Sequence, residues 1–226
     1  MKQEDISFHQ GHRERLRQKF LEDKITDYEL LELLLSFAIP RIDVRPLARG
    51  LMKKFGGLYQ ILTASYEDLI SYKGIGKNTA VFIKAIQSVM IKGYKSCLDT
   101  RPIFHDENIL SNYCKLMLAG KAVEEFHILY LNTDRRLLAD DLHSTGTVDW
   151  TAVYPREILK RALDLNAKYV VLLHNHPTPN RSFSMQDIET TMNIQHLLSA
   201  VDIELYDHFI VSGGILYSAK NMFLLK

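Results

Sequence analysis

The stretch Val170–Asp187, VVLLHNHPTPNRSFSMQD, decides the fold of this part of the chain and raises the question of its function. Four aliphatic residues predict a buried strand, and His174 and His176 follow at its end. Because residues two apart on a strand face the same way, both imidazoles are expected on one side. Pro177 cannot extend the ladder of backbone hydrogen bonds, so the strand is expected to end there.

A helix is expected to begin soon after this turn. Ser184 fits the N-cap, which places Asp187 in the first helical turn, near the strand end if the loop folds back. Two imidazole nitrogens and one carboxylate oxygen, each about 2 Å from an ion, form a three-ligand zinc set with a fourth position left for water. A metal in such a site acidifies that water and polarises a substrate carbonyl.

Each of these residues also has an ordinary structural explanation. Ser184 and Asp187 fit a capping box, and a histidine at a strand end is commonly a hydrogen-bond partner. Capping leaves both histidines unexplained. A metal site explains the whole gap-free series of His-x-His, seven residues and Ser-x-x-Asp, and we therefore favour it.

The chain around this stretch alternates between strand and helix patterns. Strands are expected at Phe126–Leu131, Leu137–His143, Tyr169–Leu173 and Ile203–Val211, and helices at Ile109–Ala119, from Pro155 through Leu163, and at Met185–Ser199. This alternation predicts an α/β domain over residues 109–226.

The first hundred residues predict helices only. The apolar stretch from Tyr28 to Phe37 is closed by Pro40, and further helices are expected at Val44–Phe55, Ser65–Tyr72 and Lys77–Tyr94. We expect a helical domain over residues 1–98 and a linker over 99–108.

A glycine-containing turn joins the last two of these helices. Gly74 and Gly76 lack the side chains that would hold a phosphate away from the backbone, Ile75 can fill the core, and Lys73 and Lys77 add positive charge. Such a turn could bind a nucleic-acid backbone without reading its sequence. The alternative is a tight corner between helices in which the glycines serve backbone geometry alone.

Composition narrows the remaining function classes. Residues 1–100 carry 16 Lys and Arg against 12 Asp and Glu, a mild basic excess that is compatible with nucleic acid but too small to argue for it alone. The two cysteines, Cys97 and Cys114, indicate neither a disulfide framework nor a thiolate zinc site. With no signal peptide or membrane-spanning run, we expect a soluble cytoplasmic protein that does not bind membranes.

Two resemblances sharpen these expectations. The stretch LISYKGIGKNTAVFIKAI resembles the helix-hairpin-helix motif of DNA repair and recombination proteins, expected here over residues 65–90, in which Gly-Ile-Gly amides contact DNA phosphate. The series His-x-His-x(7)-Ser-x-x-Asp is similar to the signature of JAMM (MPN-type) metalloproteases, and HNHP resembles their RadC branch. Further RadC-like blocks occur in order: GHRERLRQKF, EEFHILYLN, STGTVDW, YPREILKRALDLNAKYVVLLHNHP and IELYDHFIV.

The RadC resemblance implies a fold and a set of roles. The fold would be an α/β (α+β) JAMM/MPN-like domain with a mixed sheet and flanking helices, preceded by a small all-α helix-hairpin-helix domain. His174, His176 and Asp187 would ligate Zn²⁺, and Ser184 would stabilise the oxyanion of the tetrahedral intermediate.

The family also uses a general-base glutamate at the start of an upstream strand. Glu124 matches the RadC spacing Glu-x-Phe, whereas Glu125 matches the Glu-Phe arrangement of archaeal relatives. We favour Glu124, the alternative being that either residue is a solvated carboxylate at the strand end.

Some positions depart from the family pattern. Thr178-Pro179-Asn180-Arg181 stands where RadC sequences usually continue Ser-Gly-Asp-Pro, and Tyr154 replaces a common histidine. The ligands and the loop length are kept, so metal binding is better supported than activity. Asp207 and His208 also recur in the family, and we interpret them as a buried structural pair, the alternative being that they support the metal ligands.

These observations favour a zinc hydrolase that acts on a peptide or isopeptide amide of a peptide or protein substrate, joined to a helical domain that associates with DNA. The alternative is a non-catalytic DNA repair or recombination accessory protein whose zinc site is structural or vestigial. The sequence does not indicate an oligomeric state.

Overall fold

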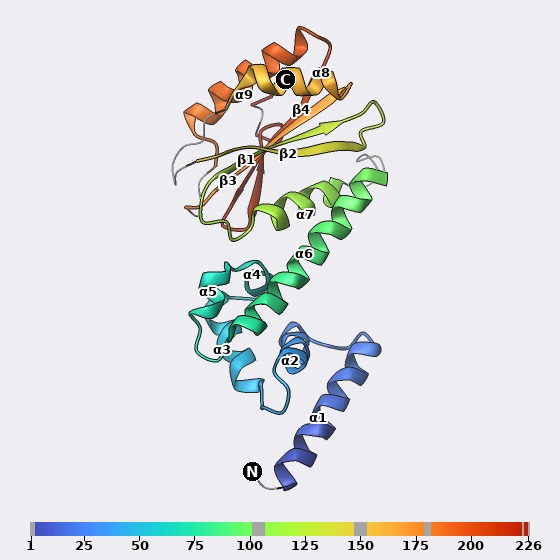
Figure 1. The fold of residues 1–226 in the computed structure, drawn as a ribbon, viewed down its shortest axis with the longest axis vertical. Coiled ribbons are helices and arrows are strands. Elements are labelled where there is room, and N and C mark those ends of the chain that lie inside the picture. The colour runs from blue at the N-terminus through green and yellow to red at the C-terminus, as the bar shows by residue number, and fades with distance from the viewer. Residues whose placement is uncertain (1–2, 101–106, 147–152, 179–181, 223, 226) are drawn as a thin grey trace. The chain divides into compact units, whose positions relative to one another are not determined.

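The computed structural model describes residues 3–100, 107–146, 153–178, 182–222 and 224–225 (Figure 1). The chain forms two compact units, Met1–Ser88 and Val89–Lys226, which divide inside the helix α6 (Lys77–Thr100). The sequence favoured a later boundary, after residue 98. The boundary lies earlier because Leu98, with Ile91 and Tyr94, packs in the core of the second unit. Residues 101–106 of the expected linker lie outside the described residues.

The first unit is helical, as predicted. Its elements are α1 (Gln3–Leu21), α2 (Asp27–Ala38), α3 (Arg45–Phe55), α4 (Leu58–Thr63), α5 (Tyr66–Ile70) and the first part of α6. Thr26 and Glu29 form a capping box at the start of α2, and Gly56 ends α3 in a left-handed conformation with φ of 92°. The helices α1 and α4 were not predicted, because α1 is strongly polar and α4 has only six residues.

The second unit is an α/β domain. Its elements are the end of α6, α7 (Glu107–Leu118), β1 (Glu125–Leu131), β2 (Leu137–Thr145), α8 (Pro155–Asp164), β3 (Tyr169–His176), α9 (Met185–Ser199), β4 (Glu204–Ser212) and β5 (Ile215–Ser218). Within the described residues the strands form one sheet in the order β2-β1-β3-β4-β5, in which β3 and β4 are parallel and the other neighbours antiparallel. The expected mixed sheet is confirmed; β5, a four-residue strand, was not predicted.

Helices cover both faces of this sheet, α8 and α9 on one and α7 on the other (Figure 1). The strand residues divide accordingly. Phe126, Ile128, Val170 and Leu172 join the core beneath α8 and α9, whereas odd-numbered neighbours such as Leu173 join the core on the α7 side. Since side chains alternate along a strand, even-numbered residues at the ends of β1 and β3 face α9.

The central strand β3 carries the histidine motif to its end. It is buried along most of its length, and it pairs with β1 on one side and β4 on the other. Pro177 follows directly, so β3 stops where its ladder would lose a donor. Among the described residues, no helix is both long and apolar enough to cross a membrane.

Candidate metal centre

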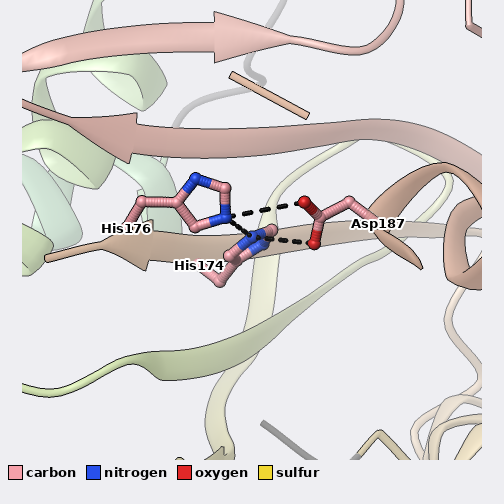
Figure 2. Close-up of side chains that lie close together, drawn as sticks. All are labelled: His174, His176 and Asp187. Carbon is pink, nitrogen blue, oxygen red and sulfur yellow. Dashed lines mark hydrogen bonds and ion pairs between the residues drawn. The ribbon is translucent and has the colours of Figure 1, made fainter. Parts of the chain in front are cut away.

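Three metal-binding side chains meet where β3 ends and α9 begins. His174 and His176 are the last even-numbered residues of β3, and Asp187 lies in the first turn of α9. Figure 2 shows both imidazoles turned toward the Asp187 carboxylate. Their ligand atoms all lie within 4.8 Å of one another, and His174 is fully buried. The end of β3 and the first turn of α9 therefore lie close together, as a shared metal site requires.

The spacing of these atoms fits a small tetrahedral ion. The Nε2 atoms of His174 and His176 are 3.1 Å apart; His174 Nε2 lies 3.2 Å from Asp187 Oδ1, and His176 Nε2 lies 3.5 Å from Asp187 Oδ2. Ligand atoms about 2.0–2.1 Å from a tetrahedral zinc would be about 3.3–3.4 Å apart. Two imidazole nitrogens and a carboxylate oxygen are also donors that zinc accepts, so the residues present fit Zn²⁺.

Electrostatics keep the Asp187 carboxylate charged. Burial raises its pKa, but hydrogen bonds from His174 and His176 outweigh that effect and hold the pKa far below its usual range. The carboxylate is therefore ready to ligate a cation at neutral pH.

Ser184 caps the helix that carries Asp187. Its Oγ donates to Asp187 Oδ2 at 2.6 Å and accepts from Asp187 N at 3.1 Å, while its backbone N–H donates to the same Oδ2 at 2.7 Å. The capping box and the metal-ligand arrangement are thus present together. Capping fixes the carboxylate and leaves Oδ1 turned toward His174.

The sheet register separates Glu124 from Glu125. Phe126 pairs with His174, and Gly146 N donates to Glu124 O, which continues the β1–β2 ladder through Glu124. Strand alternation therefore places Glu124 on the same face as Phe126 and His174, and Glu125 on the opposite face. Glu124 is 7% exposed, so it is not a solvated carboxylate.

Glu125 belongs to a separate polar cluster. It pairs with Lys121 at 2.9 Å and with His127 at 3.3 Å, and His127 also lies 3.1 Å from Asp140, which accepts a hydrogen bond from Tyr113. These contacts occupy Glu125 on the α7 side of the sheet. The geometry favours Glu124, of the two, as the glutamate facing the ligands.

Asn175 holds the segment that carries Glu124. Its side chain lies between the two histidines in sequence but faces the other way, where Oδ1 accepts from Glu125 N at 2.9 Å and Nδ2 donates to Val123 O at 3.0 Å. The two bonds bracket Glu124 on either side. Asn175 is 3% exposed.

His208 packs directly behind His174; both Asp207 and His208 are buried as expected, and the backbone N–H of His208 donates to Asp207 Oδ1 at 2.7 Å, but their side chains bond to different partners. The two residues face opposite sides of β4: Asp207 accepts from Ser218 Oγ at 2.6 Å and from Lys220 N at 3.0 Å, whereas His208 Nε2 lies 2.9 Å from His174 Nδ1. Burial lowers the pKa of His208 well below its usual value, so the ring is neutral.

The predicted DNA-contacting residues lie together between α5 and α6. Lys73, Gly76 and Lys77 are exposed and Ile75 is buried, as expected of a residue that fills the core. Gly74 has φ of +102°, and an added Cβ would lie 3.1 Å from Leu47 Cδ1, so backbone geometry requires this glycine.

Comparison with known proteins identifies the class. Residues 104–223 match the family described as RadC-like JAB domain, and residues 5–81 match the one described as UPF0758 N-terminal. The chain belongs to the family of RadC-like JAB domain proteins, as the sequence motifs predicted. Neither family description mentions a helix-hairpin-helix, so that motif stays a prediction.

Two relatives show that the likeness extends over nearly the full length. A UPF0758 protein of Ruegeria pomeroyi is 37% identical over 212 residues, covering 92% of this chain and 95% of the relative. A UPF0758 protein of Fusobacterium nucleatum is 36% identical over 219 residues, covering 92% and 94%.

The sequence did not point to Asn175 or Thr191, and it favoured a structural interpretation of His208 over its contact with His174. Asn175 stood inside the quoted motif, and strand alternation already placed it opposite the histidines. Thr191 and His208 reach His174 through pairing of β3 with β4 and packing of α9 on β4, and the sequence gives no local signal for either.

Proposed function

We propose that this chain is a zinc-dependent hydrolase that cleaves a peptide or isopeptide amide, and that its helical unit associates with DNA. One observation supports the hydrolase most strongly. His174, His176 and Asp187 present three zinc-type donors within 4.8 Å of one another, and the pairing of Phe126 with His174 favours Glu124 on the same face of the sheet.

His174 Nε2, His176 Nε2 and an Asp187 oxygen would hold the ion. A bound zinc supplies a Lewis acid that polarises the scissile carbonyl and lowers the pKa of water to about 7. The protein supplies the rest. The ligands sit on a central strand and a capped helix, so their positions are set before any metal or substrate arrives.

Glu124 is the proposed general base. Its carboxylate would take a proton from the attacking water and pass it to the leaving amine. The burial of Glu124 and the two Asn175 hydrogen bonds on either side of it support this role, because a base must be held within hydrogen-bond reach of the water.

Ser184 is the proposed oxyanion donor. It lies beside the ligands at the start of α9, and its hydroxyl hydrogen is donated to Asp187 Oδ2. Stabilising an oxyanion requires that this hydrogen turn from Asp187 to the substrate. The backbone N–H of Ser184 would keep Asp187 bonded meanwhile.

The test combines metal content with turnover. The purified full chain should contain about one zinc per chain and should cleave at least one member of a panel of fluorogenic peptides and isopeptide-linked substrates. Zinc without turnover on any amide would favour the accessory role over the hydrolase.

The DNA proposal rests on the turn between α5 and α6. Gly76, unlike Gly74, has no positive φ and no atom within 4 Å of an added Cβ, so protein packing does not require a glycine there. Close approach of a phosphate does account for it. Flanking Lys73 and Lys77 supply the charge.

Gly76→Ala separates this proposal from a packing corner. We expect a melting temperature lowered only as far as an alanine at the N-cap of α6 explains, and weaker binding to a fluorescent duplex DNA, with Lys73→Gln as a charge control that lowers the salt dependence of binding. If the wild-type chain binds no duplex at low salt, the DNA association is wrong.

A further inference from the structure

A chain of polar groups runs behind His174 and ends on the backbone of another proposed ligand. His174 Nδ1 lies 2.9 Å from His208 Nε2, and His208 Nδ1 lies 2.6 Å from Thr191 Oγ1. Thr191 Oγ1 in turn donates to the carbonyl oxygen of Asp187. The chain connects β3 to α9 through β4.

The direction of every bond in this chain follows from the Thr191 hydroxyl. A hydroxyl has a single hydrogen, and Thr191 gives it to Asp187 O, so its oxygen accepts from His208 Nδ1–H. A neutral imidazole that donates from Nδ1 accepts at Nε2. His174 therefore donates from Nδ1, so its Nε2, which faces His176 and Asp187, is the nitrogen available to a metal.

Burial and aromatic packing keep the rings in this arrangement. His174 and His208 are fully buried and Thr191 is 1% exposed. The Phe126 ring stacks on His174 at a centroid distance of 5.3 Å and an angle of 13°, and Phe183 packs edge-on against His208 at 5.2 Å. Turning either imidazole would leave buried polar atoms without partners, which is strongly disfavoured.

We propose that Thr191 and His208 are positioning residues that fix His174 as the Nδ1–H tautomer, so that Nε2 presents its lone pair to the metal. This inference rests on the proposed zinc centre. Neither residue is expected to touch the substrate. Partners of this kind commonly change metal affinity by about 10–100-fold when removed, because they set the tautomer and orientation of the ligand.

We call the hydrogen-bond chain from His174 through His208 and Thr191 to Asp187 O the relay. The zinc affinity of the full chain, measured by competition with a chromophoric chelator, tests it. Thr191→Val keeps the side-chain shape and removes the hydroxyl, so it should weaken zinc binding by about 10–100-fold. Thr191→Ser keeps the hydroxyl and should restore the affinity. The matched control is Ser218→Ala, which deletes a buried hydroxyl bonded to Asp207 on the other side of β4.

The Ser218→Ala variant should bind zinc like the wild type even if it melts at a lower temperature. Equal loss of affinity in Thr191→Val and Ser218→Ala, or no loss in Thr191→Val, would overturn the relay.

A second measurement separates the relay from the metal centre. Long-range ¹H–¹⁵N spectra of the metal-free wild type should show His208 as the Nδ1–H tautomer, and an Nε2–H tautomer would overturn the relay whatever the zinc result. A wild-type chain that takes up no zinc while showing the Nδ1–H tautomer would instead refute the proposed metal centre.

Discussion

The side chain of Asn175 accepts a hydrogen bond from the backbone N–H of Glu125 at 2.9 Å, across two neighbouring strands. Together with the bond from Asn175 Nδ2 to Val123 O, it fixes the residue between them, Glu124. The middle residue of the His-Asn-His motif thus orients the proposed base, while its two neighbours hold the proposed metal.

Asn175→Ala should therefore impair turnover without removing zinc. Removing the amide leaves Glu125 N–H and Val123 O without this partner, at a cost of about 1–3 kcal/mol in the free energy of unfolding. Turnover of an amide substrate should fall while zinc content stays at the wild-type level. Loss of zinc from this variant would show that Asn175 supports the ligands instead.

Asp187→Asn should lose most of the bound metal, because a neutral amide replaces the one anionic ligand. We expect zinc affinity to fall by more than about 100-fold, which is the largest loss usual for residues that only hydrogen-bond to a metal ligand. Metal analysis after dialysis measures this. The chain carries a control in α5, where Ser65 Oγ accepts from Asp68 N and donates to Asp68 Oδ2, and where the sequence has no histidine between residues 13 and 104. Asp68→Asn should retain full zinc content.

Glu124→Gln should keep zinc and lower kcat by about 10²–10⁴-fold, the usual contribution of a general base. Its neighbour provides the control. Glu125→Gln removes the ion pair with Lys121 and the contact with His127 on the other face, so it should change stability by no more than about 1 kcal/mol and leave kcat close to wild type. The reverse pattern in the two variants would assign the base to Glu125.

Ser184→Ala should lose both of its roles. Removal of an N-cap hydroxyl costs about 1 kcal/mol in the free energy of unfolding, and removal of an oxyanion donor lowers kcat by about 10²–10³-fold. Ser65→Ala removes the equivalent cap of α5 and should reproduce the stability loss alone. Equal kcat in Ser184→Ala and wild type would restrict Ser184 to capping.

The stability of the helical unit should depend on pH through Glu29. Its hydrogen bonds, first with Lys19 and then with the backbone of Thr26, lower its pKa from 4.5 to about 2. A carboxyl whose pKa is lowered by folding adds stability that is present above the unfolded pKa and disappears as pH falls through about 4.5 to 2. Glu29→Gln should flatten stability against pH across this window in denaturant titrations. If the free energy of unfolding varied with pH in the same way in the wild type and in Glu29→Gln, Glu29 would not be the group responsible.

Much of the proposed ligand set could be anticipated because it is local. His174 through Asp187 form one continuous stretch, so alternation along a strand and the position of a helix cap were enough to group the ligands. The major helices and four of the strands likewise follow from apolar periodicity and from proline and glycine signals.

The remaining features depend on register. The choice between Glu124 and Glu125 is supported by the pairing of Phe126 with His174, and the contact of His208 with His174 needs β3 beside β4 in a particular alignment. No short stretch of sequence encodes either alignment. The strand β5 was missed for a related reason, since four residues are too few to show a period.

The placement of the boundary inside α6 bears on how the chain can be divided. A fragment that starts at residue 99 would omit Ile91, Tyr94 and Leu98 and leave bare the apolar surface that they cover. Such a fragment is expected to aggregate when produced in cells, whereas a fragment that starts near Val89 keeps that apolar surface buried. Separate production of the sheet-containing half should begin within α6, well before the linker expected at residue 99.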